Sequence, residues 1–155
     1  MNLKKIDTSV IKERLRLSYC SIIKQGIEID VIGNSIVYAS QSFEVLNTIK
    51  DFFPSKDISE IKFGFNFVQI QGNMPQGEEL HIHVSYLIGI AVEGKGKLIY
   101  KKNETVLTEL VESGDMFFIP RNAFHYFEGD PVIRFSALEF GPIIDYQKHY
   151  YDQVE

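Results

Sequence analysis

The stretches HIHVSYLIGIAVEGKG (81–96) and GDMFFIPRNAFH (114–125) decide how this 155-residue chain is interpreted. Both combine histidine with short runs of β-branched and aromatic residues, and both contain glycine, asparagine or proline where a strand would turn. Side chains two residues apart in a strand point to the same face. A strand over residues 79–84 would therefore turn His81 and His83 to one side, where both imidazoles can approach a single ion.

The chain around these stretches is a succession of short β-rich runs. Between them lie turn residues, among which Gly94-Lys95-Gly96 is interpreted as a hairpin turn and Gly129-Asp130 as a turn between strands. This alternation of short β-rich runs and turn residues predicts a mainly β protein built as an antiparallel sandwich or barrel. The expected strands are 62–71, 79–84, 87–92, 97–101, 105–111, 116–119, 124–127 and 132–140.

The residues before the β-rich region are expected to form a mixed extension. A helix is predicted over about residues 9–24, a hairpin over 27–32 and 35–39, and a second helix over about 42–52. The apolar residues expected to share the inner faces of the two helices are Ile11, Leu15, Tyr19, Ile22, Phe43, Leu46 and Ile49.

Length and composition indicate one globular domain. We expect a single domain over 1–155, divided into the extension (1–56), a barrel core (57–142) and a C-terminal tail (143–155). No apolar run approaches the roughly 20 residues that cross a membrane, and the charged first residues lack a secretory signal. We therefore expect a soluble, cytoplasmic protein with no membrane partner.

The charged residues also narrow the class of partner. A net charge of −5 argues against nucleic acid, which is bound by clustered Lys and Arg. Cys20 is the only cysteine, so an intrachain disulfide and a thiolate zinc cage are both excluded. The expected partner is a small molecule, and any metal must be held by nitrogen and oxygen ligands.

The histidine stretches resemble the two motifs of the cupin superfamily over about residues 65–140. The first motif is a His-x-His pair, a glutamate separated from it by three or four residues, and a glycine separated from that glutamate by six residues. The second is a glycine, a proline six positions later, a glycine two after that, and a histidine three further on. The matching residues are His81, His83 and Gly94, then Gly114, Pro120, Asn122 and His125. The resemblance implies a double-stranded jelly-roll barrel and a metal on the three histidines.

The glutamate of the first motif is missing. Counting back from Gly94 places Leu87 there, and the next register places Ile88, neither of which binds a metal. The resemblance thus narrows to cupins with three histidine ligands, among them thiol dioxygenases and the diketone-cleaving dioxygenase. One divalent transition metal is expected, Fe(II) first, while zinc, nickel and copper also suit imidazole ligands.

The function implied is a three-histidine Fe(II) dioxygenase acting on a small anionic or chelating substrate. Two alternatives stay open: a redox-neutral isomerase, lyase or dehydratase that uses the metal to polarise a carbonyl, and a non-catalytic cupin that binds a small molecule. A degenerate cupin that lost the metal together with the glutamate is a third.

Polar side chains near the motifs are candidates for holding the substrate. Arg134 can pair with a carboxylate, and Glu79 can support an imidazole as an outer acceptor. The other candidates are Tyr86, Tyr100, Tyr126, Gln69 and Gln71. Phe65, Phe67, Phe118 and Phe127 are expected to form wall or core. The aromatic-rich strands before residue 72 are expected to join two copies in a homodimer.

Overall fold

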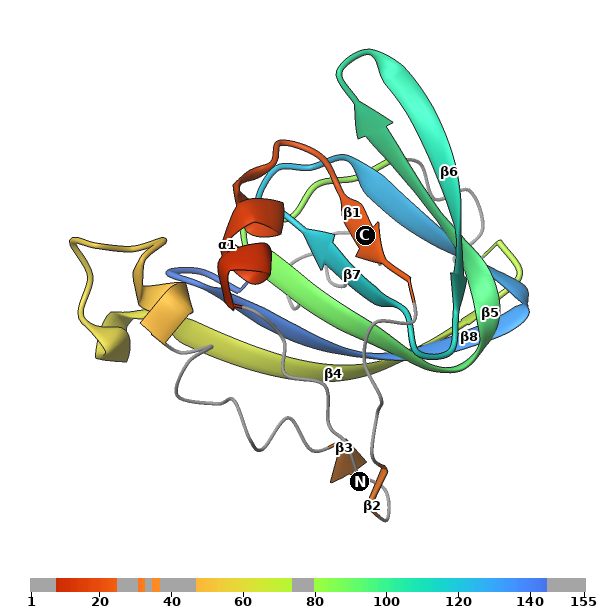
Figure 1. The fold of residues 1–155 in the computed structure, drawn as a ribbon, viewed down its shortest axis with the longest axis horizontal. Helices are drawn as coiled ribbons and strands as arrows, with labels where there is room; N and C mark the ends of the chain where they lie inside the picture. The colour runs from red at the N-terminus through yellow and green to blue at the C-terminus, as the bar shows by residue number, and fades with distance from the viewer. Residues whose placement is uncertain (1–7, 25–30, 33–34, 37–46, 74–79, 145–155) are drawn as a thin grey trace, which may run out of the picture.

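The protein is mainly β (Figure 1). The computed structural model describes residues 8–24, 31–32, 35–36, 47–73 and 80–144. The elements are α1 (Thr8–Arg16), β1 (Ser21–Ile23), β2 (Val31–Ile32), β3 (Ser35–Ile36), the 3-10 helix η1 (Ile58–Glu60), β4 (Lys62–Gln71), β5 (Tyr86–Lys102), β6 (Thr105–Glu112), β7 (Met116–Ile119) and β8 (His125–Gly141). None of the helices in these ranges is long and apolar enough to cross a membrane.

The sheet is antiparallel and open at its edges. Its strand order is β1-β7-β5-β8-β4, with β6 added to β5. The predicted antiparallel β class is therefore confirmed, and the jelly-roll arrangement appears as one bent sheet rather than a closed ring of strands. The small β2–β3 sheet confirms pairing within the predicted hairpin, with Val31 opposite Ile36; the rest of that hairpin lies outside the described residues.

Two long strands replace four of the predicted short ones. The runs 87–92 and 97–101 belong to β5, and the runs 124–127 and 132–140 belong to β8. The prediction of turns at Gly94-Lys95-Gly96 and Gly129-Asp130 was wrong. These glycines lie where β5 and β8 shift register and bend. A larger residue would not fit there, because a Cβ on Gly94 would come within 2.1 Å of the Val132 carbonyl oxygen. Glycine here allows two backbones to approach closely.

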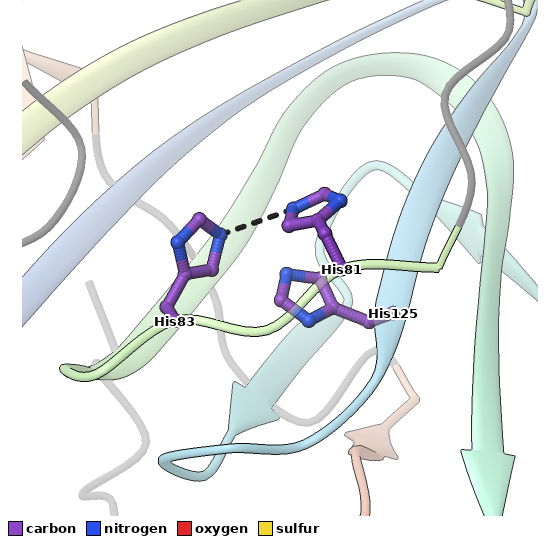
Figure 2. A group of neighbouring side chains, drawn as sticks. All are labelled: His81, His83 and His125. Carbon is purple, nitrogen blue, oxygen red and sulfur yellow. Dashed lines mark hydrogen bonds between the residues drawn. The ribbon is translucent and has the colours of Figure 1, made fainter. Parts of the chain in front are cut away.

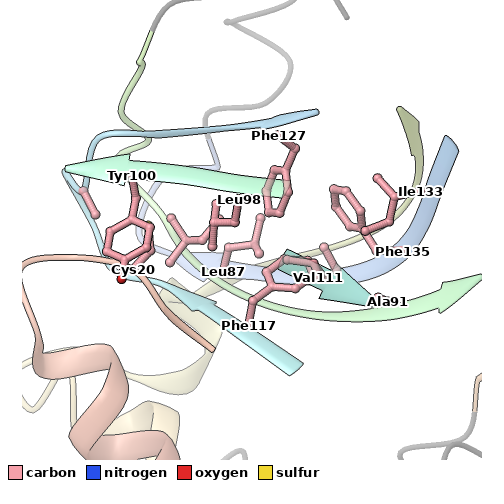
Figure 3. Close-up of a cluster of buried hydrophobic side chains, with 13 residues drawn as sticks. Cys20, Leu87, Ala91, Leu98, Tyr100, Val111, Phe117, Phe127, Ile133 and Phe135 are labelled. Atoms are coloured by element: carbon pink, nitrogen blue, oxygen red, sulfur yellow. The ribbon is translucent and has the colours of Figure 1, made fainter. Parts of the chain in front are cut away.

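The bend folds the sheet into two facing layers. One layer contains the first part of β5 and the second part of β8, with β7 and β4; the other contains the remaining parts of both strands, with β6. Side chains from both layers, such as Leu87 and Leu98, share one core cluster (Figure 3). The two ends of each long strand therefore lie opposite the bend, at an open end that we call the mouth.

A second core cluster covers the outer face of the sheet. Ile11 and Leu15 of α1 pack there with Ile49, in a segment whose described residues 47–50 are helical. The predicted helix over 9–24 was too long. It ends at Arg16, because Ser21–Ile23 form β1 and pair with β7, a case in which sheet pairing overrides helical periodicity.

Candidate metal centre

His81 and His83 lie on an irregular segment that leads into β5. The strand predicted over 79–84 is reduced in the described residues to one bridge, in which His81 and His125 exchange N–H to carbonyl hydrogen bonds of 3.2 and 3.0 Å. The prediction of a regular strand was wrong because this segment passes from the layer of His125 to the layer where Tyr86 pairs with Phe140.

A turn at Asn122, in the second motif, holds the first motif in place through a backbone hydrogen bond. Asn122 has a φ of 62°, the left-handed backbone that asparagine tolerates better than most residues, so its replacement of the motif glycine is accommodated. Its N–H donates to the carbonyl of His83 at 2.9 Å. The two motifs are therefore joined through the main chain at the mouth.

The three imidazoles converge from these two segments (Figure 2). One ligand atom from each of His81, His83 and His125 lies within 4.8 Å of the others. The Nε2 atoms of His81 and His83 are 3.2 Å apart. Two nitrogens bound to one ion at about 2.1 Å would lie roughly 3.0–3.4 Å apart, so this separation fits a shared ion.

His125 is oriented for coordination. It is 2% exposed, and its Nδ1 lies 2.9 Å from the carbonyl oxygen of Ala123. Because a carbonyl only accepts, Nδ1 carries the proton and Nε2 keeps its lone pair for a metal. Both histidine motifs thus meet at one mouth of a bent, two-layered antiparallel sheet. The chain has a cupin-type fold.

Leu87, at the predicted position of the missing glutamate, has apolar surroundings. Leu87 belongs to the inner core cluster at the mouth, and the three-histidine group in the described residues includes no carboxylate. A carboxylate does lie nearby in the sheet: Glu139 is 3% exposed and stands directly opposite Leu87 on β8. Glu139 was not among the site residues predicted from the sequence, although it continues the inward alternation of Phe135 and Ala137.

Arg134 and the two glutamines are not brought together with the histidines. Arg134 lies on the outer face of β8, where its Nε donates to Oε1 of Gln69 at 2.9 Å and its Nη1 lies 3.0 Å from a carboxylate oxygen of Glu93. Gln71 is exposed and shares the face of Gln69, opposite the inward Val68 and Ile70.

The tyrosines divide between the two faces. Tyr86 stacks on Phe140 in the outer cluster, and Tyr126 alternates outward between His125 and Phe127. Of the three candidate tyrosines, Tyr100 faces inward, opposite His125 in register. Burial, with a hydrogen bond and repulsion from Glu109, raises the pKa of Tyr100 to about 12. Its phenol is therefore a neutral donor, not a base, at physiological pH.

The predicted wall residues also divide. Phe118 and Phe127 are buried as expected, in the outer and inner clusters respectively. Phe65 and Phe67 are 69% and 70% exposed, so their expected place in the wall or core was wrong: on β4 they alternate away from the inner face. Glu79 lies outside the described residues.

Comparisons with known proteins overlap only part of the chain. No protein-family model matches the sequence, and no curated protein matches it. Among solved structures, hydroxypropylphosphonic acid epoxidase from S. wedmorenis shares 15% identity over 49% of this chain and 42% of its own, with a TM-score of 0.43. An RmlC-like cupin family protein from Methanocaldococcus jannaschii shares 15% over 50% and 68%, with a TM-score of 0.41.

Oxalate decarboxylase from Lactobacillus farciminis shares 28% identity over 61% of this chain and 28% of its own, with a TM-score of 0.43. The chain thus spans less than half the length of the epoxidase and of the decarboxylase.

Proposed function

We propose that this cupin-type protein is a metal-dependent enzyme whose His81, His83 and His125 hold one divalent transition metal, Fe(II) in the first instance. The observation that supports this most is the convergence of three imidazole ligand atoms within 4.8 Å. Imidazole suits Fe, Zn, Ni and Cu, whereas Mg and Ca prefer oxygen ligands. The proposed reaction is dioxygenation of a small anionic or chelating substrate.

The chain's own residues orient the site. The Ala123 carbonyl holds the His125 ring, and the Phe127 ring of the inner core cluster lies 6.3 Å from it, centroid to centroid. A bound iron would supply Lewis acidity and one-electron chemistry with oxygen. Three neutral imidazoles leave the full double positive charge of the site uncompensated by ligands, which favours substrates that bring an anionic group.

Two other functions use the same histidines. A redox-neutral isomerase, lyase or dehydratase would need only the Lewis acidity of the ion, for which zinc or nickel suffices. A non-catalytic cupin would bind a small molecule at the mouth without turnover. The three functions differ in whether oxygen and substrate are consumed.

Metal occupancy tests the site. Protein reconstituted with Fe(II) or Zn(II) and desalted is expected to retain up to one ion per chain, and loading should raise the melting temperature because the ion binds the folded state. His125→Ala is expected to lose the ion. His149→Ala is the matched control, since His149 is the histidine outside both motifs. Equal metal content in all three proteins would contradict the assignment.

Oxygen uptake then separates the functions. Iron-loaded protein with a β-diketone or a small thiol as probe is expected to consume oxygen and probe together, and zinc-loaded protein is expected to consume neither. Probe conversion without oxygen would instead indicate the redox-neutral reaction. Binding without conversion of any probe would indicate the non-catalytic protein.

A further inference from the structure

Glu139 is a buried carboxylate on the inner face of the sheet. It has no role in the metal chemistry proposed above. We infer that it supplies, from the neighbouring strand, the negative charge that the Leu87 position lacks. The inference deepens the proposed function and depends on the three-histidine metal site.

The register of the sheet places Glu139 beside the vacant ligand position. Glu139 pairs with Leu87 across β8 and β5. Side chains of such directly opposed residues lie on the same face, with Cβ atoms about 4.5–5.5 Å apart. Phe135 and Ala137, which precede Glu139 on the same face of β8, are members of the inner core cluster. The carboxylate therefore shares the interior with the histidines.

Glu139 and His125 occupy the two ends of one bent strand. His125 begins β8 and pairs with Tyr100 near the end of β5, whereas Glu139 stands near the end of β8 and pairs near the start of β5. Because the bend lies between them and both layers face one core cluster, the two residues come to the same mouth from facing layers. The carboxylate lies across the mouth from the third histidine.

The side chain of Glu139 extends over the neighbouring strand β4. A Cβ on Gly64, the residue of β4 paired with Glu139, would lie 4.0 Å from Oε2 of Glu139, an ordinary van der Waals distance. The carboxylate thus extends over Gly64 and is not among the atoms grouped with the histidines. It acts on the ion as a counter-charge rather than as a ligand.

Such a charge acts on the ion from the buried side of the site, where His125 is 2% exposed, whereas His81 and His83 are half-buried. A cupin glutamate would be a ligand at the position of Leu87, and a carboxylate one strand away interacts with the same dication through space. At an effective dielectric constant of about 20, one negative charge changes the affinity for a dication by at least about tenfold at any separation up to about 15 Å. Glu139 is expected to contribute to metal affinity by this amount.

The test measures binding of Zn(II) and Co(II) alone, by competition with a chromophoric chelator. Glu139→Gln is expected to weaken binding at least about tenfold while the stoichiometry stays near one ion per chain. Glu93→Gln is the matched control, because Glu93 lies on the neighbouring strand and pairs with Arg134 on the outer face. That control is expected to bind as tightly as the unmodified protein.

Two further variants separate charge from packing. Glu139→Asp keeps the charge and is expected to bind within about threefold of the unmodified protein. Leu87→Glu combined with Glu139→Gln moves the carboxylate to the cupin ligand position and is expected to restore tight binding. An unchanged affinity in Glu139→Gln would overturn the inference, as would equal losses in Glu139→Gln and Glu139→Asp.

The same measurement distinguishes failure of this inference from failure of the proposed function. If His125→Ala abolishes binding and Glu139→Gln does not weaken it, the metal site stands and the role of Glu139 is refuted. If His125→Ala binds as tightly as the unmodified protein, the three-histidine site itself is refuted.

Discussion

Main-chain groups of Asn122 and Ala123 position two of the histidines, His83 and His125. The N–H of Asn122 donates to the carbonyl of His83, and the carbonyl of Ala123 accepts from Nδ1 of His125. Both contacts are made by backbone atoms, so they depend on the left-handed turn and not on the side chains of the two residues. A single residue with unusual backbone freedom therefore fixes how the second motif meets His83, which lies 39 positions earlier in the sequence.

A prediction at the residue scale concerns alkaline stability. Burial, with a smaller contribution from Glu109, raises the pKa of Cys20 from 9.0 to about 12. The unfolded chain therefore loses this proton first, and stability is expected to be intact below pH 9 and to fall as pH rises from about 9 towards 12. Tyr100, raised from 10.0 to about 12, adds to the fall in the upper part of this range.

Urea unfolding at pH 8 and pH 10 measures this effect. The free energy of unfolding should be lower at pH 10, and the difference should shrink in Cys20→Ala, which removes the thiol and its titration. A difference of the same size in both proteins would show that other groups control alkaline stability.

At the scale of elements, the sequence predicts strands whose limits are marked locally. The predicted runs 62–71 and 116–119 coincide with β4 and β7. The predictions of turns at Gly94 and Gly129 were wrong because glycine in a β-bulge and glycine in a turn give similar sequence patterns. Only the pairing of β5 with β8, residues distant along the chain, decides between them.

Gly94 gives an element-scale prediction about the bend. It has a φ of +79°, and a Cβ there would meet the Val132 carbonyl oxygen at 2.1 Å. Gly94→Ala is expected to lower the free energy of unfolding by about 1–3 kcal/mol or more, from overpacking combined with backbone strain. Gly72 is the control, because it has a φ of +53° with nothing within 4 Å of its Cβ position.

Gly72→Ala therefore carries the strain alone and is expected to cost about 1 kcal/mol. Urea denaturation of the two variants measures the difference. Equal losses would mean that β5 and β8 can separate at the bend without cost. The metal affinity of Gly94→Ala should fall as well, because the bend brings the two ends of β8 to one mouth.

For the whole molecule, the sequence predicted the histidines better than their surroundings. The spacing of the motifs is a short-range property, and it correctly brought His81, His83 and His125 to one place. Which face of a strand looks inward depends on the whole sheet. Arg134 and Gln69 therefore could not be assigned to the outer face, nor Glu139 to the inner one, until the register of β4, β5 and β8 was known.

At the scale of the whole molecule, the edge strand β4 offers a surface for assembly. It pairs with β8 and with no other strand of the described residues, which makes it an edge of this sheet. Phe65 and Phe67 stand out from it, at 69% and 70% exposure. Exposed aromatic residues beside an unpaired edge are typical of surfaces that bind a partner.

A second copy of the chain is the partner we propose. The only charged residue of β4 is Lys62, at its end, so two copies of the strand can pair antiparallel about a twofold axis without opposing like charges at the centre.

Light scattering is expected to give about twice the chain mass of 17.8 kDa at micromolar concentration. Phe65→Lys combined with Phe67→Lys should give monomers, because four added charges would face one another across the axis. Val106→Lys, which replaces an exposed apolar residue on β6, should leave the dimer intact. A monomeric unmodified protein, or a dimer that survives the double substitution, would exclude β4 as the interface.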